Sequence, residues 1–591
     1  MREGQIKEIL LSKNVSRAFG WVQDSGNLDS LCNVVSVFDC ESAFHSSLAK
    51  EIIPGIISEK DGRDEILKAL SARPLSLKYR MLIGTSFTPR SSARCNGIIQ
   101  AAVKGQKRAY ISDWPADNFI RWAHALGFIK YDYSNDTFSI TDIGLALTHS
   151  SGEEKNKLLE QAILSYPPAY RVLSLLSAPN NPLTKFEIGA KLGFSGEDGF
   201  ISYPLCSIVA ALDYAKKTKN NSEIKEIRSD WESSSDKYAR TIAQWLKHLG
   251  FVKNCIKTIA TEYAGENVSA DLPAFCITPK GERALKNTRG NSRHPKIKKI
   301  VSYEMFATKS KDREYLRFRR SYILKFLYEK GKFVSYSDIS DYLKSKGINE
   351  GIETIKDDIS GINSIGIDIN FSKNGVSLED AIQSFFIPVY KTKEEKSDIS
   401  KEKDIMREKL KKVPHEYLSL MDLAYDPKQN RLFEIKAMDL FINEFGFCGT
   451  HLGGASRPDG ILYADFSSAD MKGYGIIADM KAYSKGYDLP ISQQDEMRRY
   501  IGNNQKRDAA INPLKWWEEF PEKIKKFYFM FVSGSFKGKI DEKLRKIFIE
   551  TNVSGTAMAI KTALLAAEKI RQGQMSLADF AQKINNTEYK S

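Results

Sequence analysis

Two stretches of the chain share one pattern of apolar and polar positions, although they lie far apart in the sequence. Each contains Trp, three residues, Leu-Gly-Phe, a β-branched residue and Lys, and each continues to Ile-Thr-x-x-Gly. The pattern predicts an amphipathic helix, two short strands and a further helix. The copies are residues 121–149 and residues 244–286, the second with an insertion before its last segment.

The residues at the helix ends of each copy support this prediction. We expect the first helix to end at Gly127 or Gly250, because a helix often ends on a residue in the left-handed conformation. The last helix is expected to begin after Thr141 or Thr278, whose hydroxyl can cap free backbone N–H groups. Three helices and a two-stranded wing form a winged helix, which usually places one helix in the major groove of DNA.

A third helical region spans about 313–385. Helices are predicted near 313–330, 336–345 and 350–362, followed by a strand pair in IGIDINFS and GVSL. This region also resembles a winged helix, but its last helix is acidic and should repel phosphates. We therefore expect that helix, which carries Glu353, Asp357 and Asp358, to contact protein.

The last part of the chain holds the candidate chemistry. A helix from about 430 to 445 is followed by an apolar run that ends in Asp479-Met480-Lys481. As a buried strand, this run places Asp479 and Lys481 on one face and Met480 on the other. Pro-Asp occurs once in the chain, at Pro458-Asp459, twenty residues upstream of Asp479.

Phosphodiester hydrolysis needs residues of these types. Two carboxylates, Asp459 and Asp479, can hold Mg²⁺ through hard oxygen ligands. The ammonium group of Lys481 can orient the attacking water and offset developing negative charge. This is the PD-(D/E)xK signature of nucleases. The competing interpretation is a salt bridge at a strand end, and Glu434 on the preceding helix is a surface acid or a further contributor.

Composition and charge favour a large globular protein with a polyanionic partner. At 591 residues the chain should form roughly three to five domains. Its net charge is +14, from 88 Lys+Arg against 74 Asp+Glu, which favours nucleic acid. The basic connector at 286–299 is a solvated linker or a phosphate contact, and residues 391–412 are a charged linker or an exposed helix.

Other features indicate the cellular setting. Seven cysteines are scattered without Cys-x-x-Cys spacing, so we expect reduced thiols and neither a zinc site nor a redox pair. There is no secretory signal and no stretch of roughly 20 apolar residues. These observations predict a cytoplasmic protein without a membrane partner. No phosphate-binding GxxxxGK[ST] loop occurs, so nucleotide hydrolysis is not indicated.

Several segments resemble the FokI-like family of type IIS restriction endonucleases, and together they cover essentially the whole chain. They include FGWVQ (19–23), NFIRWAHALGF (118–128), WESSSDKYAR (231–240), HLGGASRPDG (451–460) and KAYSKGYDLPISQQDEM (481–497). The resemblance implies Mg²⁺ dependence and cleavage of double-stranded DNA at a fixed distance outside an asymmetric site, here expected to be GGATG-like. It assigns catalysis to Asp459, Asp479 and Lys481, with the metal on the two aspartates.

The resemblance also implies partners. Cleavage requires transient pairing of two nuclease domains, with Asp495 and Arg499 as a reciprocal ion pair. A protective methyltransferase is implied as a genetic partner, and no stable protein partner is expected. The positions implied to contact bases or backbone are Gln23, Asp24, Arg90, Gln106, Trp114, Glu232, Lys237 and Arg240, whose types include donors and acceptors suited to the major groove.

The expected architecture is a multidomain α+β chain with three winged-helix-like units and a C-terminal α/β PD-(D/E)xK nuclease domain. The expected segments are 1–150, 151–290, 291–388, a linker at 389–412, and the nuclease domain at 413–591. Two other functions stay open at this point. One is a winged-helix regulator with an inactive nuclease-like domain, and the other is a nuclease that nicks or cuts without a specific site.

Overall fold

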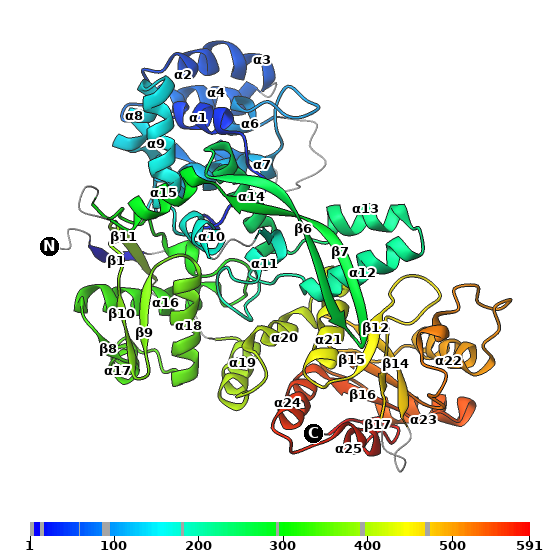
Figure 1. Cartoon of the computed structure of the whole chain (residues 1–591). Helices are drawn as coiled ribbons and strands as arrows, with labels where there is room; N and C mark the ends of the chain where they lie inside the picture. The colour runs from blue at the N-terminus through cyan, green and yellow to red at the C-terminus, as the bar shows by residue number, and fades with distance from the viewer. Residues whose placement is uncertain are drawn as a thin grey trace. The chain divides into compact units, whose positions relative to one another are not determined.

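The computed structural model describes residues 5–11, 17–57, 60–84, 95–178, 182–290, 295–390, 396–466 and 473–590. The chain folds into two compact units, each built from more than one stretch of sequence. The first unit comprises Met1–Phe194, Ser234–Ile256 and Pro273–Lys396, and the second comprises Ser195–Ser233, Lys257–Leu272 and Ser397–Ser591. Both contain helices and sheets (Figure 1), as expected of a multidomain α+β chain.

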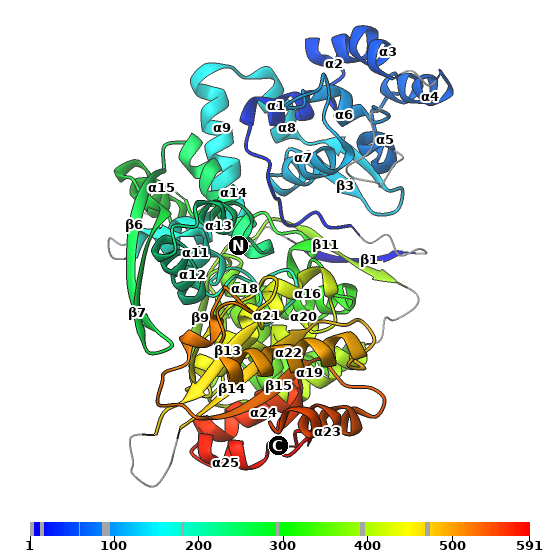
Figure 2. The same cartoon turned by 90° about the vertical axis from the view of Figure 1, so that its right-hand side faces the viewer.

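The sequence repeat forms two copies of one local structure. Both glycines that end the first helix have the left-handed backbone expected, with φ of 77° at Gly127 and 73° at Gly250. The wing of the second copy is a much longer ribbon than that of the first (Figure 2). The elements are α7 (Asp113–Ala125), β3 (Ile129–Asp132), β4 (Thr137–Ile140) and α8 (Asp142–His149), then α14 (Ser234–His248), β6 (Val252–Tyr263), β7 (Glu266–Ile277) and α15 (Pro279–Thr288).

The Ile-Thr-x-x-Gly signature has a physical cause in each copy. Thr141 Oγ1 accepts a hydrogen bond from Gly144 N and donates to Gly127 O at 2.7 Å. Thr278 repeats both contacts with Gly281 N and Gly250 O. A Cβ atom at Gly144 would lie 2.1 Å from a carbonyl oxygen, and one at Gly281 would lie 2.2 Å from its counterpart. The glycines are therefore required by close backbone approach.

One aromatic contact joins the copies. The indole rings of Trp122 and Trp245 stack with centroids 4.7 Å apart and an interplanar angle of 12°. Both side chains are fully buried, so the residue that opens each repeat contributes to a shared core.

The third helical region forms as predicted, with a three-stranded sheet in the order β8-β10-β9. Its acidic helix does face protein at Asp358, which receives hydrogen bonds of 2.6 Å from Arg319 Nε and Arg320 Nε. Burial alone would raise the pKa of the Asp358 carboxyl, but the two guanidinium groups outweigh it and lower the pKa. The elements are α16 (Arg313–Lys330), β8 (Val334–Ser335), α17 (Tyr336–Ser345), α18 (Ile352–Ser364), β9 (Ile369–Ser372) and β10 (Gly375–Leu378).

The second unit contains a six-stranded mixed sheet in sequence order. The first three strands are antiparallel, and the last four are parallel. Helices α21 and α22 lie on opposite sides of it (Figure 1). The elements are α21 (Asn430–Asn443), β12 (Cys448–His451), β13 (Gly460–Ala464), β14 (Tyr474–Lys481), α22 (Ile491–Lys506), β15 (Lys526–Ser533), α23 (Ile540–Thr551), β16 (Gly555–Ala559) and β17 (Thr587–Glu588).

Two expectations need correction. The charged stretch before the nuclease region contains helix α19 (Asp398–Lys409), which is not simply an exposed helix or open linker. Its Lys403 and Arg407 are buried, and bonds to Asp422 and Glu197 offset the cost of burying their charges. Cys255 and Cys276 are not free thiols, since they form a disulfide between β6 and β7, two neighbouring strands of one ribbon. Within the described ranges, no helix has the length and apolar character needed to cross a membrane.

The buried ion pairs of Asp358 generate a stability prediction. Asp358→Ala leaves two buried guanidinium groups without this partner and should lower the free energy of unfolding by about 3–5 kcal/mol. Urea unfolding at neutral pH measures the loss. Asp341→Ala is the control, because its ion pair with Lys344 is exposed and should change stability by about 0–1 kcal/mol. A loss for Asp358→Ala no larger than the control's would contradict this account.

Candidate nuclease site

Strand register brings the two candidate carboxylates together. In the antiparallel pair β13–β14, Gly460 lies opposite Ala478. One further step of the same register places Asp459 opposite Asp479, and side chains of directly opposed residues lie about 4.5–5.5 Å apart at Cβ. Asp459 and Asp479 are twenty positions apart in the sequence, and they lie close together because β13 pairs with β14.

Lys481 completes the group from the same strand face as Asp479. Its Nζ donates to Asp459 Oδ2 at 3.1 Å and to Asp479 Oδ1 at 2.9 Å. Asp459 Oδ2 also accepts from the backbone N–H of Met480 at 2.7 Å. Met480 itself points into the opposite face and is fully buried, as strand alternation predicts. The structure therefore brings all three predicted residues into one hydrogen-bonded cluster.

The electrostatics of the cluster are those of crowded negative charge. Burial raises the pKa of Asp479 well above its usual value, and the adjacent charge of Asp459 raises it further. Burial alone would lower the pKa of Lys481, but the two carboxylates outweigh it and raise the pKa. The lysine is thus held protonated beside a carboxylate whose ionisation is opposed. A bound cation would relieve that opposition.

A supporting layer from α21 and β12 surrounds the cluster. Asn430 Oδ1 accepts from Ala482 N at 2.9 Å, which fixes the backbone just after Lys481. The amide of Asn430 also donates to Glu434, whose other oxygen lies 3.4 Å from His451 Nε2. Burial raises the pKa of Glu434, and Asp459 adds to this rise. Sequence reasoning missed Asn430 and His451 because no local pattern connects them with the strand.

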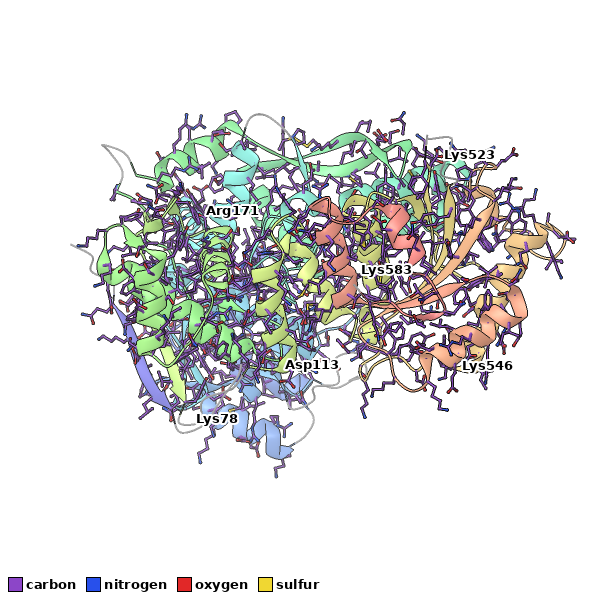
Figure 3. The ribbon with its side chains drawn as sticks, turned by 90° about the horizontal axis from the view of Figure 1, so that it is seen from below. Lys78, Asp113, Arg171, Lys523, Lys546 and Lys583 are labelled. Carbon is purple, nitrogen blue, oxygen red and sulfur yellow. A yellow bond between two sulfur atoms is a disulfide. The ribbon has the colours of Figure 1, made fainter. Side chains whose placement is uncertain are left out.

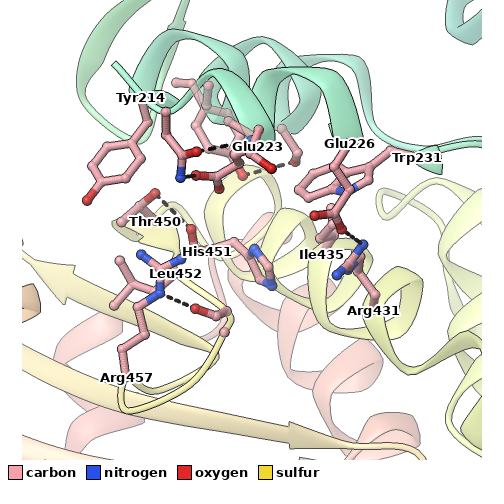
Figure 4. Close-up of a pocket in the computed structure, with 18 residues that line it drawn as sticks. Tyr214, Glu223, Glu226, Trp231, Arg431, Ile435, Thr450, His451, Leu452 and Arg457 are labelled. Carbon is pink, nitrogen blue, oxygen red and sulfur yellow. Dashed lines mark hydrogen bonds and ion pairs between the residues drawn. The ribbon is translucent and has the colours of Figure 1, made fainter. Parts of the chain in front are cut away.

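A cavity of about 330 Å³ adjoins this layer. Its walls come from α12 (Leu205–Lys217) and α13 (Asn221–Asp230) on one side, and from α21 and the 450–457 loop on the other. Arg431 Nη1 donates to Glu226 Oε1 at 2.6 Å across it (Figure 4). The same loop also holds the backbone of Asp459, because Leu452 N and Gly453 N both donate to the carbonyl oxygen of Asp459.

The donor set suits a hard cation held by few protein ligands. Asp459 and Asp479 converge, and the part of the chain that the structure describes contains no cluster of three or more His, Cys, Asp or Glu able to enclose a metal. Hard divalent cations such as Mg²⁺ are often held by one or two carboxylates together with substrate phosphate. The residues therefore fit a site completed by its substrate.

The candidate DNA-contacting residues of the first unit are only partly grouped. Asp24 Oδ1 accepts from Arg240 Nη2 at 2.7 Å, and Asp24 N donates to Thr241 Oγ1, so the 19–25 loop lies against α14. Lys237 precedes Arg240 by three positions on the same helix and shares its face. Gln23 is buried and Gln106 is exposed, while the exposed ring of Trp114 lies under the Arg121 guanidinium at 5.4 Å.

Two other candidates complete the predicted set. Glu232 is half-buried and belongs to the second unit, just before α14 begins. Arg90 lies outside the described residues.

The candidate pairing residues lie on the accessible side of α22. Asp495 bonds to Arg498 at 2.5 Å, and Arg499 bonds to Glu496 at 3.2 Å. The side chains of Asp495 and Arg499 are 63% and 55% exposed. Each therefore has a helical partner three residues away, and the two do not bond to each other.

Four FokI domain families match the chain in succession. The matches are the FokI recognition domain, subdomain 1, at 17–150, and subdomain 2, at 155–293, the FokI D3 domain at 306–374, and the FokI cleavage domain at 396–590. The type II restriction enzyme FokI of Planomicrobium okeanokoites is 41% identical over 581 residues, which are 97% of this chain and 99% of that protein. The chain belongs to the FokI family of type II restriction enzymes.

Other members of the FokI family give the same result. The type II restriction enzyme StsI of Streptococcus sanguinis is 34% identical over 96% of this chain and 95% of its own length. The solved structure of the restriction endonuclease FokI matches with a TM-score of 0.90 at 39% identity, over 98% of this chain and all of that one. FokI bound to DNA matches with a TM-score of 0.92 at 40% identity, over 97% of this chain and all of that one.

Membership of the FokI family gives the cluster its meaning. Asp459, Asp479 and Lys481 fall within the match to the FokI cleavage domain. A cleavage domain of a type II restriction endonuclease implies dependence on a divalent metal, and the two carboxylates are the groups in this cluster that could hold one.

The raised pKa of Asp479 predicts an unusual acid limit for cleavage. Metal binding by Asp479 would need its charged form, which is lost on acidification through a pKa well above the ordinary value of about 3.9. On acidification, the cleavage rate should therefore be lost at a higher pH than an ordinary aspartate would give. A higher concentration of divalent metal should move this acid limit to lower pH. Rate profiles against pH at two metal concentrations measure this. A limit near pH 4 that ignores metal would contradict the assignment.

Proposed function

We propose that this chain is a type IIS restriction endonuclease that binds a short asymmetric site in double-stranded DNA and cuts both strands outside it with Mg²⁺. The observation that carries the proposal is the cluster of Asp459, Asp479 and Lys481 where β14 ends in the interior of the sheet. Its convergence also disfavours an inactive nuclease-like domain, since burying two neighbouring carboxylates costs stability that a purely structural site could avoid.

Each residue has a distinct part in hydrolysis. Asp459 and Asp479 would hold Mg²⁺, which when bound would supply Lewis-acid stabilisation of the scissile phosphate and lower the pKa of water. Lys481 keeps its proton between the carboxylates and presents positive charge to the phosphate oxygens as negative charge builds on them. Asn430 holds the backbone of Ala482 and so limits the movement of Lys481.

Recognition is assigned to side chains of the N-terminal half. Arg240 can donate two hydrogen bonds to a guanine edge, and its bond to Asp24 holds the guanidinium in one orientation. Lys237 on the same helix face suits either a base or a phosphate. Gln23, Arg90, Gln106, Trp114 and Glu232 complete the proposed set, and a GGATG-like site is the proposed target.

Positive charge on the chain supports binding to DNA. Exposed lysines such as Lys523, Lys546 and Lys583 lie on the surface of the second unit (Figure 3). Each phosphate that lysine or arginine neutralises releases counterions, so binding should weaken as salt increases. A methyltransferase that protects the host site is the genetic partner this function requires.

Two nuclease domains are required for a double-strand break. The chain contains one Asp459–Asp479–Lys481 cluster, and one such centre hydrolyses one strand. Asp495 and Arg499 lie on one helix face and are accessible. We therefore propose an isologous contact in which Asp495 of each copy meets Arg499 of the other copy. Exposed ion pairs contribute about 0–1 kcal/mol, so pairing is weak until DNA raises the local concentration.

The active-site assignment predicts a separation of binding from cleavage. Asp459→Asn, Asp479→Asn and Lys481→Ala should each slow cleavage by at least about 100-fold, because each removes a charge from the reacting centre. Binding to the specific site, measured by gel shift in EDTA, should be unchanged. Lys526→Ala at the opposite end of the neighbouring strand β15 is the control and should cut normally. Near-wild-type cutting by any of the three variants would sink the assignment.

The pairing assignment predicts complementation. Asp495→Arg and Arg499→Asp should each fail to linearise plasmid, since like charges then face each other across the two-fold axis. An equimolar mixture should recover activity, because the reversed charges complement. Linearisation is measured against total protein concentration, with each variant alone at the same total concentration as control. A mixture as inactive as its components would place the interface elsewhere.

A further inference from the structure

The tyrosine that follows the catalytic strand is buried in an unusual way. The side chain of Tyr487 is fully buried, yet its hydroxyl has no hydrogen-bond partner among the described residues. Leaving a buried hydroxyl unpaired costs about 1–3 kcal/mol, and a phenylalanine would avoid that cost. The hydroxyl therefore needs an explanation other than packing.

Backbone hydrogen bonds hold Tyr487 beyond the end of β15, next to the strand end where the catalytic residues lie. Tyr487 N donates to Ser535 O at 2.8 Å, and Tyr487 O accepts from Lys537 N at 2.9 Å. Ser535 follows β15 by two residues, and the end of that strand, Ser533, is the register partner of Lys481. Tyr487 thus extends the β14–β15 ladder just beyond Lys481.

The ring of Tyr487 lies on the same face of the sheet as the carboxylates. Asp479 is the register partner of Phe531 in the parallel pair β14–β15, so both side chains project from one face. The Tyr487 ring packs against the Phe531 ring with centroids 6.2 Å apart. Asp479 and Asp459 both contribute to the rise in the pKa of Tyr487, after burial. The Tyr487 ring therefore lies on the sheet face that carries the catalytic aspartates, against the residue paired with Asp479.

We propose that Tyr487 is a positioning residue of the nuclease centre, whose hydroxyl donates a hydrogen bond to the Asp479 carboxylate when the site binds Mg²⁺ and the scissile phosphate. In the free protein Asp479 Oδ1 is bonded to Lys481. When Lys481 turns to the phosphate, the hydroxyl of Tyr487 replaces that donor and keeps Asp479 oriented. This inference rests on the proposed nuclease function and goes beyond its three catalytic residues.

Tyr487→Phe tests the proposal, because it removes only the hydroxyl. At saturating DNA the single-turnover cleavage rate should fall about tenfold, as expected for the loss of a hydrogen bond to a charged group. The Mg²⁺ concentration for half-maximal rate should rise, while gel-shift binding to the specific site in EDTA stays unchanged. The melting temperature of the metal-free protein should be unchanged or higher, since no bond is broken there.

Tyr474→Phe is the matched control. Tyr474 is a buried tyrosine at the opposite end of β14 from Lys481, and its hydroxyl donates to Leu577 O at 2.7 Å. Removing that hydroxyl should lower the melting temperature and leave the cleavage rate and its Mg²⁺ dependence unchanged. The two variants therefore have opposite signatures.

Three outcomes decide the matter. Tyr487→Phe that cuts like the wild type, with the same Mg²⁺ dependence, overturns this inference and leaves the proposed function intact. A lower melting temperature for Tyr487→Phe in EDTA also overturns it, because the hydroxyl would then have a structural partner. Wild-type protein that fails to cut DNA with Mg²⁺ removes the proposed function and this inference together.

Discussion

The antiparallel register of β13 and β14 is the constraint on which the candidate site depends. A slip of one residue would turn Asp459 toward the opposite face of the sheet from Asp479. Gly460 favours this register, because any Cβ there would lie 2.5 Å from the sulfur of Met438 on α21 and would force that side chain to shift. A helix packed on one face of the sheet thus fixes which side chains reach the other face. The positions of the two catalytic carboxylates therefore depend on the packing of Gly460 against Met438.

The same register creates an electrostatic cost. Two carboxylates are held side by side, and burial opposes the charge of Asp479, which one lysine only partly offsets. The surrounding apolar core keeps this arrangement in place. The row below the carboxylates along the sheet is Ile461, Ile477 and Phe529, which belong to a cluster buried under α22 and α23. The carboxylates therefore lie at the boundary of an apolar core, and a bound cation and a phosphate would stabilise this arrangement.

The first unit follows a different rule, in which backbone contacts repeat and surface side chains vary. Thr141 and Thr278 make equivalent contacts, and each copy needs a glycine three residues later. The stacked pair Trp122 and Trp245 joins the copies through their common first residue. Candidate contacts to DNA are not among the residues that the two copies share, as with Arg240 on α14. A repeated scaffold with differing exposed residues is how one fold can carry different recognition chemistry.

The sequence by itself determined the local elements and the candidate catalytic set. Helix ends at Gly127 and Gly250, the buried strand ending at Lys481, and the shared face of Asp479 and Lys481 all follow from short-range pattern, because periodicity and backbone conformation are local properties. Tertiary structure decided the rest, since contacts between distant residues leave no mark on local pattern. It buried Lys403 and Arg407 in a stretch that looked solvated, and it joined Cys255 to Cys276. It also brought Asn430 to the end of β14. It left the hydroxyl of Tyr487 without a hydrogen-bond partner among the described residues, with its ring on the sheet face that carries Asp479.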